Sequence, residues 1–126
     1  AVISGNTADY AGGGVVVYDG DFEMSGGTVN GNTAGYGGGG VYVIDGSFTM
    51  KLDAAVAVDN PVHLSSGMVI TLSGPLSADP AANITLVDPA VSGPGTQVLG
   101  GDTAANYSKF LLNGERDRID SAGLLQ

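Results

Sequence analysis

Acidic side chains in the first half of the sequence are the residues best placed to bind a metal ion. Asp19 and Asp45 are related by a spacing of 26 residues, and Asp21 lies beside the first of them. Calcium takes about six to eight oxygen ligands, which convergent carboxylates supply. Asp19 and Asp45 both precede glycine, however, and Asp is favoured in turns because its side chain bonds its own backbone. Structural turns are the favoured interpretation, and a calcium site is the alternative.

Other catalytic chemistries find little support. His63 is the single histidine, and the sequence does not place a nucleophile and an orienting acid beside it, as a catalytic triad requires. We expect it to be a surface side chain. The glycine runs at 12–14 and 37–40 lack the Gly-x-x-x-x-Gly-Lys-Ser/Thr pattern of a phosphate loop, and close-packed backbone corners explain them better. Without cysteine there is no thiolate chemistry. The sequence predicts a protein that is not an enzyme and has no metal or cofactor.

Composition excludes two classes of partner and favours a location. With 126 residues the chain is sufficient for one domain, and 13 acidic against 4 basic residues give a net charge of −9. Nucleic-acid binding is excluded because it needs clustered Lys and Arg. Membrane insertion is excluded because no apolar run approaches about 18–20 residues. A 43% hydrophobic content can form a core, and the acidic composition with few lysines favours an extracellular or cell-surface protein.

A repeat of 26 residues determines the expected fold. Each period contains three short runs rich in β-branched and aromatic residues and bounded by Gly, Asn or Asp, which is typical of strands. In the second period they lie around Val29, at 41–44 and at 48–50. No segment has a helical period over 11 or more residues. Five features recur at this spacing: Gly5-Asn6-Thr7-Ala8 with Gly31-Asn32-Thr33-Ala34, Gly12-Gly13-Gly14-Val15 with Gly38-Gly39-Gly40-Val41, Asp19-Gly20 with Asp45-Gly46, Phe22 with Phe48, and Met24 with Met50.

Three strands per period predict one coil of a parallel β-solenoid, in which each strand pairs with its equivalent about 4.8 Å along the axis. A third coil follows, with the spacing shortened to 22 from Phe48 to Ile70, and residues 83–87 and 97–99 form a looser fourth. We expect coils over residues 1–75, and a degenerate last coil with an irregular C-terminal cap over residues 76–126, within one continuous domain. Alternation places two columns inward: Val15, Val17, Val41, Val43, Val62 and Leu64, and Phe22, Met24, Phe48, Met50, Ile70 and Leu72.

Two sets of repeated residues are expected to make contacts outside the core. Asn6 and Asn32 share the repeat spacing, and we expect a structural ladder of stacked amides. The outward positions Val16, Tyr18, Tyr42 and Ile44 form an apolar set. Such a patch usually marks an interface. The alternative is that a loop from residues 76–100 covers it.

The repeat resembles a known family. The pattern Gly-Gly-Gly-Val-Tyr-Val-x-Asp-Gly-x-Phe-x-Met at residues 38–50, and Thr-Val-x-Gly-Asn-Thr-Ala at 28–34, are similar to the right-handed parallel β-helix repeats of the pectin-lyase-like superfamily. More narrowly, they resemble repetitive surface proteins of bacteria and archaea. The tail at 98–123 is similar to the segment that often closes such repeats. The resemblance implies a right-handed parallel β-helix and an extracellular setting, and it does not imply catalysis.

Three functions are compatible with these observations. The first is a non-catalytic extracellular structural protein that self-associates into a filament, sheath or array, through the open coil end at residues 1–3 and the apolar outer face. The second is a carbohydrate-binding or polysaccharide-lyase-like module that contacts a surface glycan through Tyr10, Tyr36 and Tyr42. The third is an adhesin stalk segment. Asn83 and Asn106 also begin formal N-glycosylation sequences.

Overall fold

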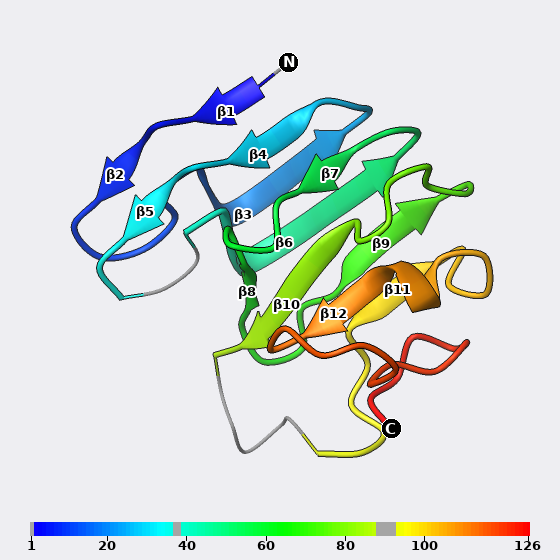
Figure 1. Ribbon diagram of the computed structural model, residues 1–126. Helices are drawn as coiled ribbons and strands as arrows, with labels where there is room; N and C mark the ends of the chain where they lie inside the picture. The colour runs from blue at the N-terminus through cyan, green and yellow to red at the C-terminus, as the bar shows by residue number, and fades with distance from the viewer. Residues whose placement is uncertain (1, 37–38, 88–92) are drawn as a thin grey trace.

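The protein is a parallel β-solenoid of about four turns. A computed structural model describes residues 2–36, 39–87 and 93–126 (Figure 1). Within these residues the only helix is a single 3₁₀ turn, η2 (Tyr107–Lys109). The all-β class and the stacked parallel coils predicted from the sequence are therefore confirmed. The described part of the chain contains no helix with the length and hydropathy to cross a bilayer.

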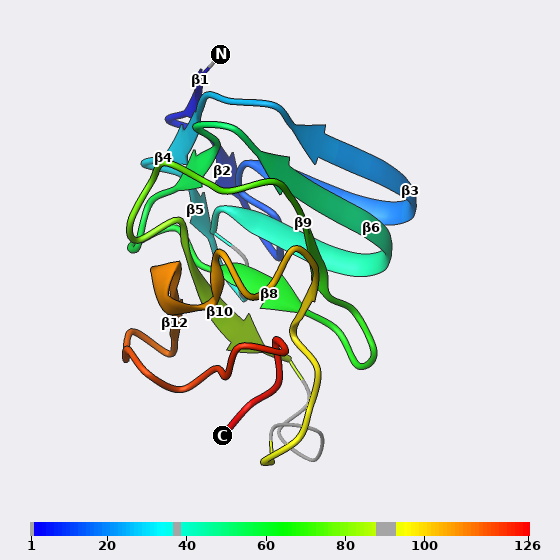
Figure 2. The same cartoon turned by 90° about the vertical axis from the view of Figure 1, so that its right-hand side faces the viewer.

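Short strands and two long ones make up the coils. The strands are β1 (Val2–Ser4), β2 (Thr7–Ala8), β3 (Val15–Met24), β4 (Thr28–Asn30), β5 (Thr33–Ala34), β6 (Val41–Lys51), β7 (Ala55–Val56), β8 (Val62–Leu64), β9 (Ile70–Ser73), β10 (Ala82–Leu86), β11 (Leu99–Gly101) and β12 (Phe110–Leu112). One face stacks β1, β4 and β7, and a small corner sheet pairs β2 with β5. The remaining strands form the largest sheet, which bends around the other faces (Figures 1 and 2).

The register follows the predicted columns. Val15 pairs with Val41, which pairs with Val62, and all the ladders between strands of successive coils are parallel. Phe48 pairs with Ile70, so the spacing shortens to 22 residues as expected. The looser fourth coil is also present, because β10 pairs with β8 and β11 pairs with β9. Equivalent residues therefore lie one above the other along the solenoid axis.

The first two coils differ from the expected arrangement at one corner. Two of the expected runs, around residues 41–44 and 48–50, belong to the single bent strand β6, and β3 is bent in the same way. The bend lies at the Asp-Gly pairs: Asp19 has φ 55° and Gly46 has φ 124°. The register shifts there, so that Tyr18 pairs with Asp45 instead of Ile44. A Cβ atom on Gly46 would overlap the carbonyl oxygen of Gly20, which explains the glycine at this close approach.

The core is fully covered in the second coil and only partly covered in the first. Val29 and Phe48 are completely buried, whereas their equivalents Ile3 and Phe22 are half-buried. The Phe22 and Phe48 rings stack with centroids 5.3 Å apart and planes within 14°. Because each coil is covered by its neighbours on both sides, this difference marks the first coil as an end of the core.

Residues 102–126 cover the opposite end. Ile119 and Leu125 are buried and form an antiparallel bridge. The carbonyl oxygen of Gly123 accepts hydrogen bonds from the backbone N–H groups of Val98 (2.9 Å) and Leu99 (3.1 Å). Figure 2 shows this C-terminal segment folded beneath the last coil, at the opposite end from the N-terminus. The segment acts as a cap, as a solenoid requires.

Candidate interface at the open first coil

The first coil has one side without strand partners in the described chain. Its strands β1, β2 and β3 pair with β4, β5 and β6 of the second coil, and with no other described strand (Figure 1). The backbone N–H and C=O groups on the other side of these strands face away from the solenoid. An edge of this kind is a template for another strand.

A cavity opens beside this edge. It has a volume of about 460 Å³ and lies between the end of β3 and β4. Its apolar wall is made by Ile3, Phe22, Met24 and Val29, which belong to the core of the first two coils. The edge therefore combines unpaired backbone with apolar surface, which is the combination found where protein chains associate.

A ladder of asparagine side chains runs along the axis. Asn6 Nδ2 donates to Asn32 Oδ1 (3.0 Å), and Asn32 Nδ2 donates to Asn60 Oδ1 (3.0 Å). Each Oδ1 atom also accepts a backbone N–H, from Asn6 (3.1 Å) and Asn32 (2.9 Å) respectively. Asn60 is a ladder residue that the 26-residue repeat does not predict, because its distance from Asn32 is 28 residues. Alignment by strand position, with a variable loop, would have found it. Asn32 and Asn60 are buried, and Asn6 is exposed at the open coil.

The apolar outer face is smaller than the sequence predicted. Val16 is 46% exposed and Tyr18 is 71% exposed, and Ile44 is half-buried. The expected exposure of Tyr42 is wrong, since this side chain is only 7% exposed. Tyr42 pairs with Val16 on one side and His63 on the other, and its ring meets the His63 ring edge-on at 5.8 Å. We define the outer patch as Val16, Tyr18 and Ile44.

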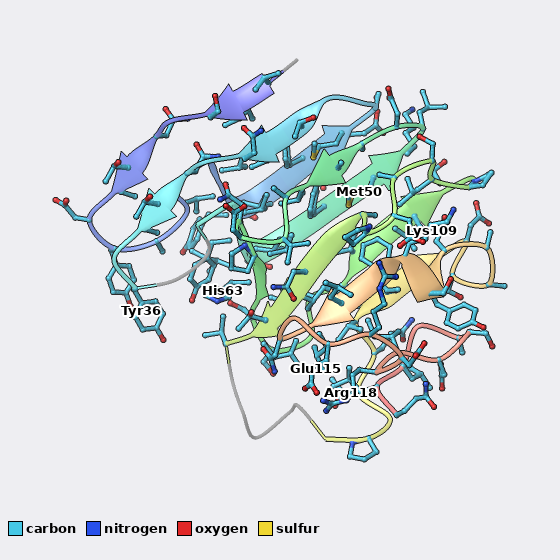
Figure 3. All side chains as sticks on the ribbon, viewed as in Figure 1. Tyr36, Met50, His63, Lys109, Glu115 and Arg118 are labelled. Atoms are coloured by element: carbon cyan, nitrogen blue, oxygen red, sulfur yellow. The ribbon has the colours of Figure 1, made fainter. Side chains whose placement is uncertain are left out.

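Tyr10 and Tyr36 lie on the corner next to β2 and β5. They are 67% and 57% exposed, and their rings stack with centroids 4.8 Å apart and planes within 7°. Figure 3 shows Tyr36 projecting from this corner. The two rings cover one face of each other, so the pair does not form a flat platform on which one sugar ring could contact both.

Tyr42 does not extend the tyrosine pair into an open binding groove. Burial raises the pKa of Tyr42, and the nearby charge that Tyr36 acquires on ionisation raises it further, while a hydrogen bond with Ser65 opposes both effects. With only 7% of its side chain exposed, Tyr42 packs beneath the surface and offers little area to a soluble ligand. The three tyrosines therefore have different environments, two at the surface and one below it.

The acidic residues considered for calcium lie at or beside the bends of β3 and β6. Asp19 and Asp45 are exposed, and Asp19 has the positive φ of a turn residue. Asp21 Oδ1 accepts a 2.6 Å hydrogen bond from Ser47 Oγ in the next coil. Among the residues that the structure describes, no three His, Cys, Asp or Glu side chains gather as a metal site would require.

The first glycine run forms a tight corner. A Cβ atom on Gly13 would lie 2.6 Å from the Thr33 carbonyl oxygen, and one on Gly14 would lie 2.7 Å from the Gly40 carbonyl oxygen. Both separations are shorter than van der Waals contact, so the backbones of adjacent coils approach too closely for a side chain. In the second run, Gly37 and Gly38 lie outside the described residues.

The two formal glycosylation sites are engaged within the fold. Asn106 is fully buried, and its side chain bonds Leu76 N (2.8 Å) and Gly74 O (2.9 Å). Asn83 Oδ1 accepts the Gly114 backbone N–H (2.8 Å), and its Nδ2 donates to Val58 O (3.2 Å). Both side chains therefore hold the last coils together, and attachment of a glycan to Asn106 is incompatible with its burial.

His63 is more enclosed than a surface side chain. It is half-buried beside Tyr42, and its Nδ1 atom is buried without a hydrogen-bond partner in the described structure. Burial lowers the pKa of His63 because the charged imidazolium loses hydration. The neutral form is therefore the one that the fold stabilises.

This environment makes a prediction for acid stability. Because the folded pKa is lower than the unfolded pKa of about 6.5, the unfolded chain binds the proton first as the pH falls. The contribution of His63 to stability should be complete above pH ~6.5, decrease as the pH falls below it, and become constant below the folded pKa. Urea titrations between pH ~5 and ~8 should show this loss in the wild type and not in a His63→Gln variant. Parallel pH profiles of the two proteins would contradict it.

Comparisons with known proteins leave the chain without an assigned family. No protein-family model, no curated protein and no solved structure matches it. The assignment of the fold as a parallel β-solenoid therefore depends on the coil register and burial of the chain itself.

Proposed function

We propose that this protein is a non-catalytic structural component of an extracellular or cell-surface assembly, and that it self-associates through the open first coil and the outer patch. The observation that carries the proposal is the exposed apolar outer patch, where Val16 is 46% and Tyr18 is 71% exposed. The first coil is less well covered than the second. Ile3, Val15 and Phe22 are half-buried, whereas their equivalents one coil later are completely buried. Removing apolar surface from water contributes about 25 cal/mol per Å² to association, and the loss of translational and rotational freedom offsets part of this gain.

The outer patch supplies a second contact surface. Val16 and Tyr18 project from β3, the same strand that forms the free edge. Tyrosine is enriched at protein interfaces, because it contributes a large apolar ring together with a hydroxyl that stays hydrated or bonded. The extracellular location is supported by the acidic composition and by the resemblance of the repeat to pectin-lyase-like surface proteins, and a surface filament, sheath or stalk is the expected setting.

Sedimentation velocity tests self-association directly. We expect the weight-average sedimentation coefficient of the wild type to rise as the concentration increases from about 1 μM to several hundred micromolar, as for interfaces near the low end of the size range. Tyr18→Lys should reduce this rise, because it removes apolar contact and adds a charge to the outer patch.

Leu52→Lys is the matched control. Leu52 is also an exposed apolar side chain, but it follows β6 and lies outside both proposed surfaces. This variant should associate like the wild type. A wild-type chain that stays monomeric over the whole concentration range would contradict the proposal.

A further inference from the structure

Two adjacent coils hold Tyr10 and Tyr36 face to face. Strand β2 pairs with β5 just before the two tyrosines, and the Tyr36 backbone N–H donates to the Tyr10 carbonyl oxygen (2.6 Å). A Cβ atom on Gly35 would overlap the carbonyl oxygen of Asp9, so the two backbones approach closely beside the pair. The rings stack with centroids 4.8 Å apart and planes within 7°, and this arrangement follows from the register of the coils.

The pair is also accessible from solution. Tyr10 is 67% exposed and Tyr36 is 57% exposed, and Figure 3 shows Tyr36 projecting from the corner. Stacking covers one face of each ring, and much of the remaining surface of each side chain is in contact with water. The pair therefore combines two phenol rings in contact with access for an oxidant.

The other three tyrosines lack this combination in the described structure. Tyr18 is 71% exposed, but its register partner in the next coil is Asp45. Tyr42 is 7% exposed, and its ring meets His63 edge-on. Tyr107 is half-buried in the 3₁₀ turn and packs against the core. A reaction that needs two accessible phenol rings in contact therefore has one site among the described residues.

We propose that Tyr10 and Tyr36 form an oxidative cross-linking site, where hydrogen peroxide and a haem peroxidase join the two rings as dityrosine. The peroxidase uses one molecule of hydrogen peroxide to take one electron and one proton from each phenol, and the peroxide is reduced to two molecules of water. The two phenoxyl radicals then form a carbon–carbon bond between ring carbons ortho to the oxygens. Each coupled carbon loses its hydrogen as a proton and each oxygen regains one, so both phenols are restored.

The stacked geometry favours coupling within one chain. A radical on either ring lies beside the second phenol, whereas the phenol of another molecule must arrive by diffusion. In protein at ~2 μM, a neighbour held in the same chain has an effective concentration of about 1 mM or more, hundreds of times higher. The rings must pivot about the coupled edge as the bond forms, and their exposed sides leave room for this movement. The reaction needs one molecule only, so it is independent of the self-association proposed above.

Peroxidase treatment at low concentration tests the site. We expect wild-type protein at ~2 μM, treated with a haem peroxidase and hydrogen peroxide, to develop dityrosine fluorescence in the monomeric fraction. The intact mass of that fraction should decrease by two hydrogen atoms. Asp19, Asp21 and Glu23 lie between the two tyrosines, so digestion at acidic residues separates Tyr10 from Tyr36 unless they are cross-linked. Fragment spectra of the joined peptides should place the link between these two residues.

Single phenylalanine variants are the matched controls. Tyr36→Phe keeps an aromatic ring in the stack but removes one phenol, so the loss of two hydrogen atoms from the monomer should disappear. Tyr18→Phe removes a tyrosine that is more exposed than either member of the pair, and it should cross-link like the wild type. Circular dichroism verifies that each variant is folded.

The position of the link separates coupling within the pair from coupling elsewhere. A link in the monomer that requires both Tyr10 and Tyr36 supports the cross-linking site. Dityrosine found only between molecules, or a monomeric link that persists in Tyr36→Phe, would overturn it. A wild-type monomer without the link, under conditions that couple free tyrosine, would overturn it as well. Each result leaves the proposed self-association standing, because the measurement is made on monomers.

Discussion

Replacing Phe48 with alanine should lower the free energy of unfolding by about 3–5 kcal/mol. Phe48 is completely buried between the first and third coils, where it pairs with Phe22 and Ile70. Removing its ring leaves a cavity, because the stacked backbones on both sides cannot move together without breaking their ladders. Urea unfolding, followed by circular dichroism, measures the loss.

Phe22→Ala is the matched control for this prediction. It removes the same ring from the same column, one coil earlier, where the side chain is only half-buried. Water or relaxation can fill the space, so the expected loss is about 1–2 kcal/mol for protein at low micromolar concentration. Equal losses for the two variants would show that the first coil is as well covered as the second, contrary to the burial described above.

Replacing Asn32 with alanine should lower the free energy of unfolding by about 2–4 kcal/mol. Its side chain accepts two hydrogen bonds from Asn6 and donates to Ile3 O (3.0 Å) and Asn60 Oδ1 (3.0 Å). Asn60 is buried, and the amide of Asn32 is one of the donors that satisfies it. An unsatisfied polar group in this position has no access to water to replace the lost bond.

Asn6→Ala tests whether the loss of stability depends on burial of the ladder residue. Asn6 occupies the equivalent place in the first coil but is exposed, so water can replace the bonds that its side chain loses. The expected loss is below about 1 kcal/mol, measured by the same urea titration. A large loss in Asn6→Ala, or a negligible one in Asn32→Ala, would contradict the account of the ladder.

Features that repeat at a constant spacing could be predicted from the sequence. The repeat predicts one column of Val15, Val41 and Val62 and another of Phe22, Phe48 and Ile70, because the side chains of stacked coils must occupy equivalent volumes. The repeated glycine run likewise predicts a tight corner at Gly13 and Gly14, because the backbones of adjacent coils approach each other closely at the same point in each coil.

Features that depend on loops of variable length could not be predicted in this way. Asn60 belongs to the ladder although its spacing from Asn32 is 28 residues, because the segment between coils two and three differs in length while the strands stay aligned. The outward direction of Tyr42 on its strand predicts that it lies at the surface. A side chain that points away from the core is not always exposed. Val16 and His63, the neighbours of Tyr42 on adjacent strands, shield it from water.

The sequence by itself determined that the chain forms stacked parallel coils, since the 26-residue repeat places chemically alike residues at equivalent positions along the axis. Only the tertiary structure decided how the predicted C-terminal cap is built and how far the outer face is exposed. The cap depends on contacts between Ile119, Leu125 and the last strands, and these contacts cannot be inferred from the repeat. Repeated side chains specify each coil from its own sequence. Burial of the end of the solenoid, or of its outer face, depends on contacts with segments that lie outside the repeat.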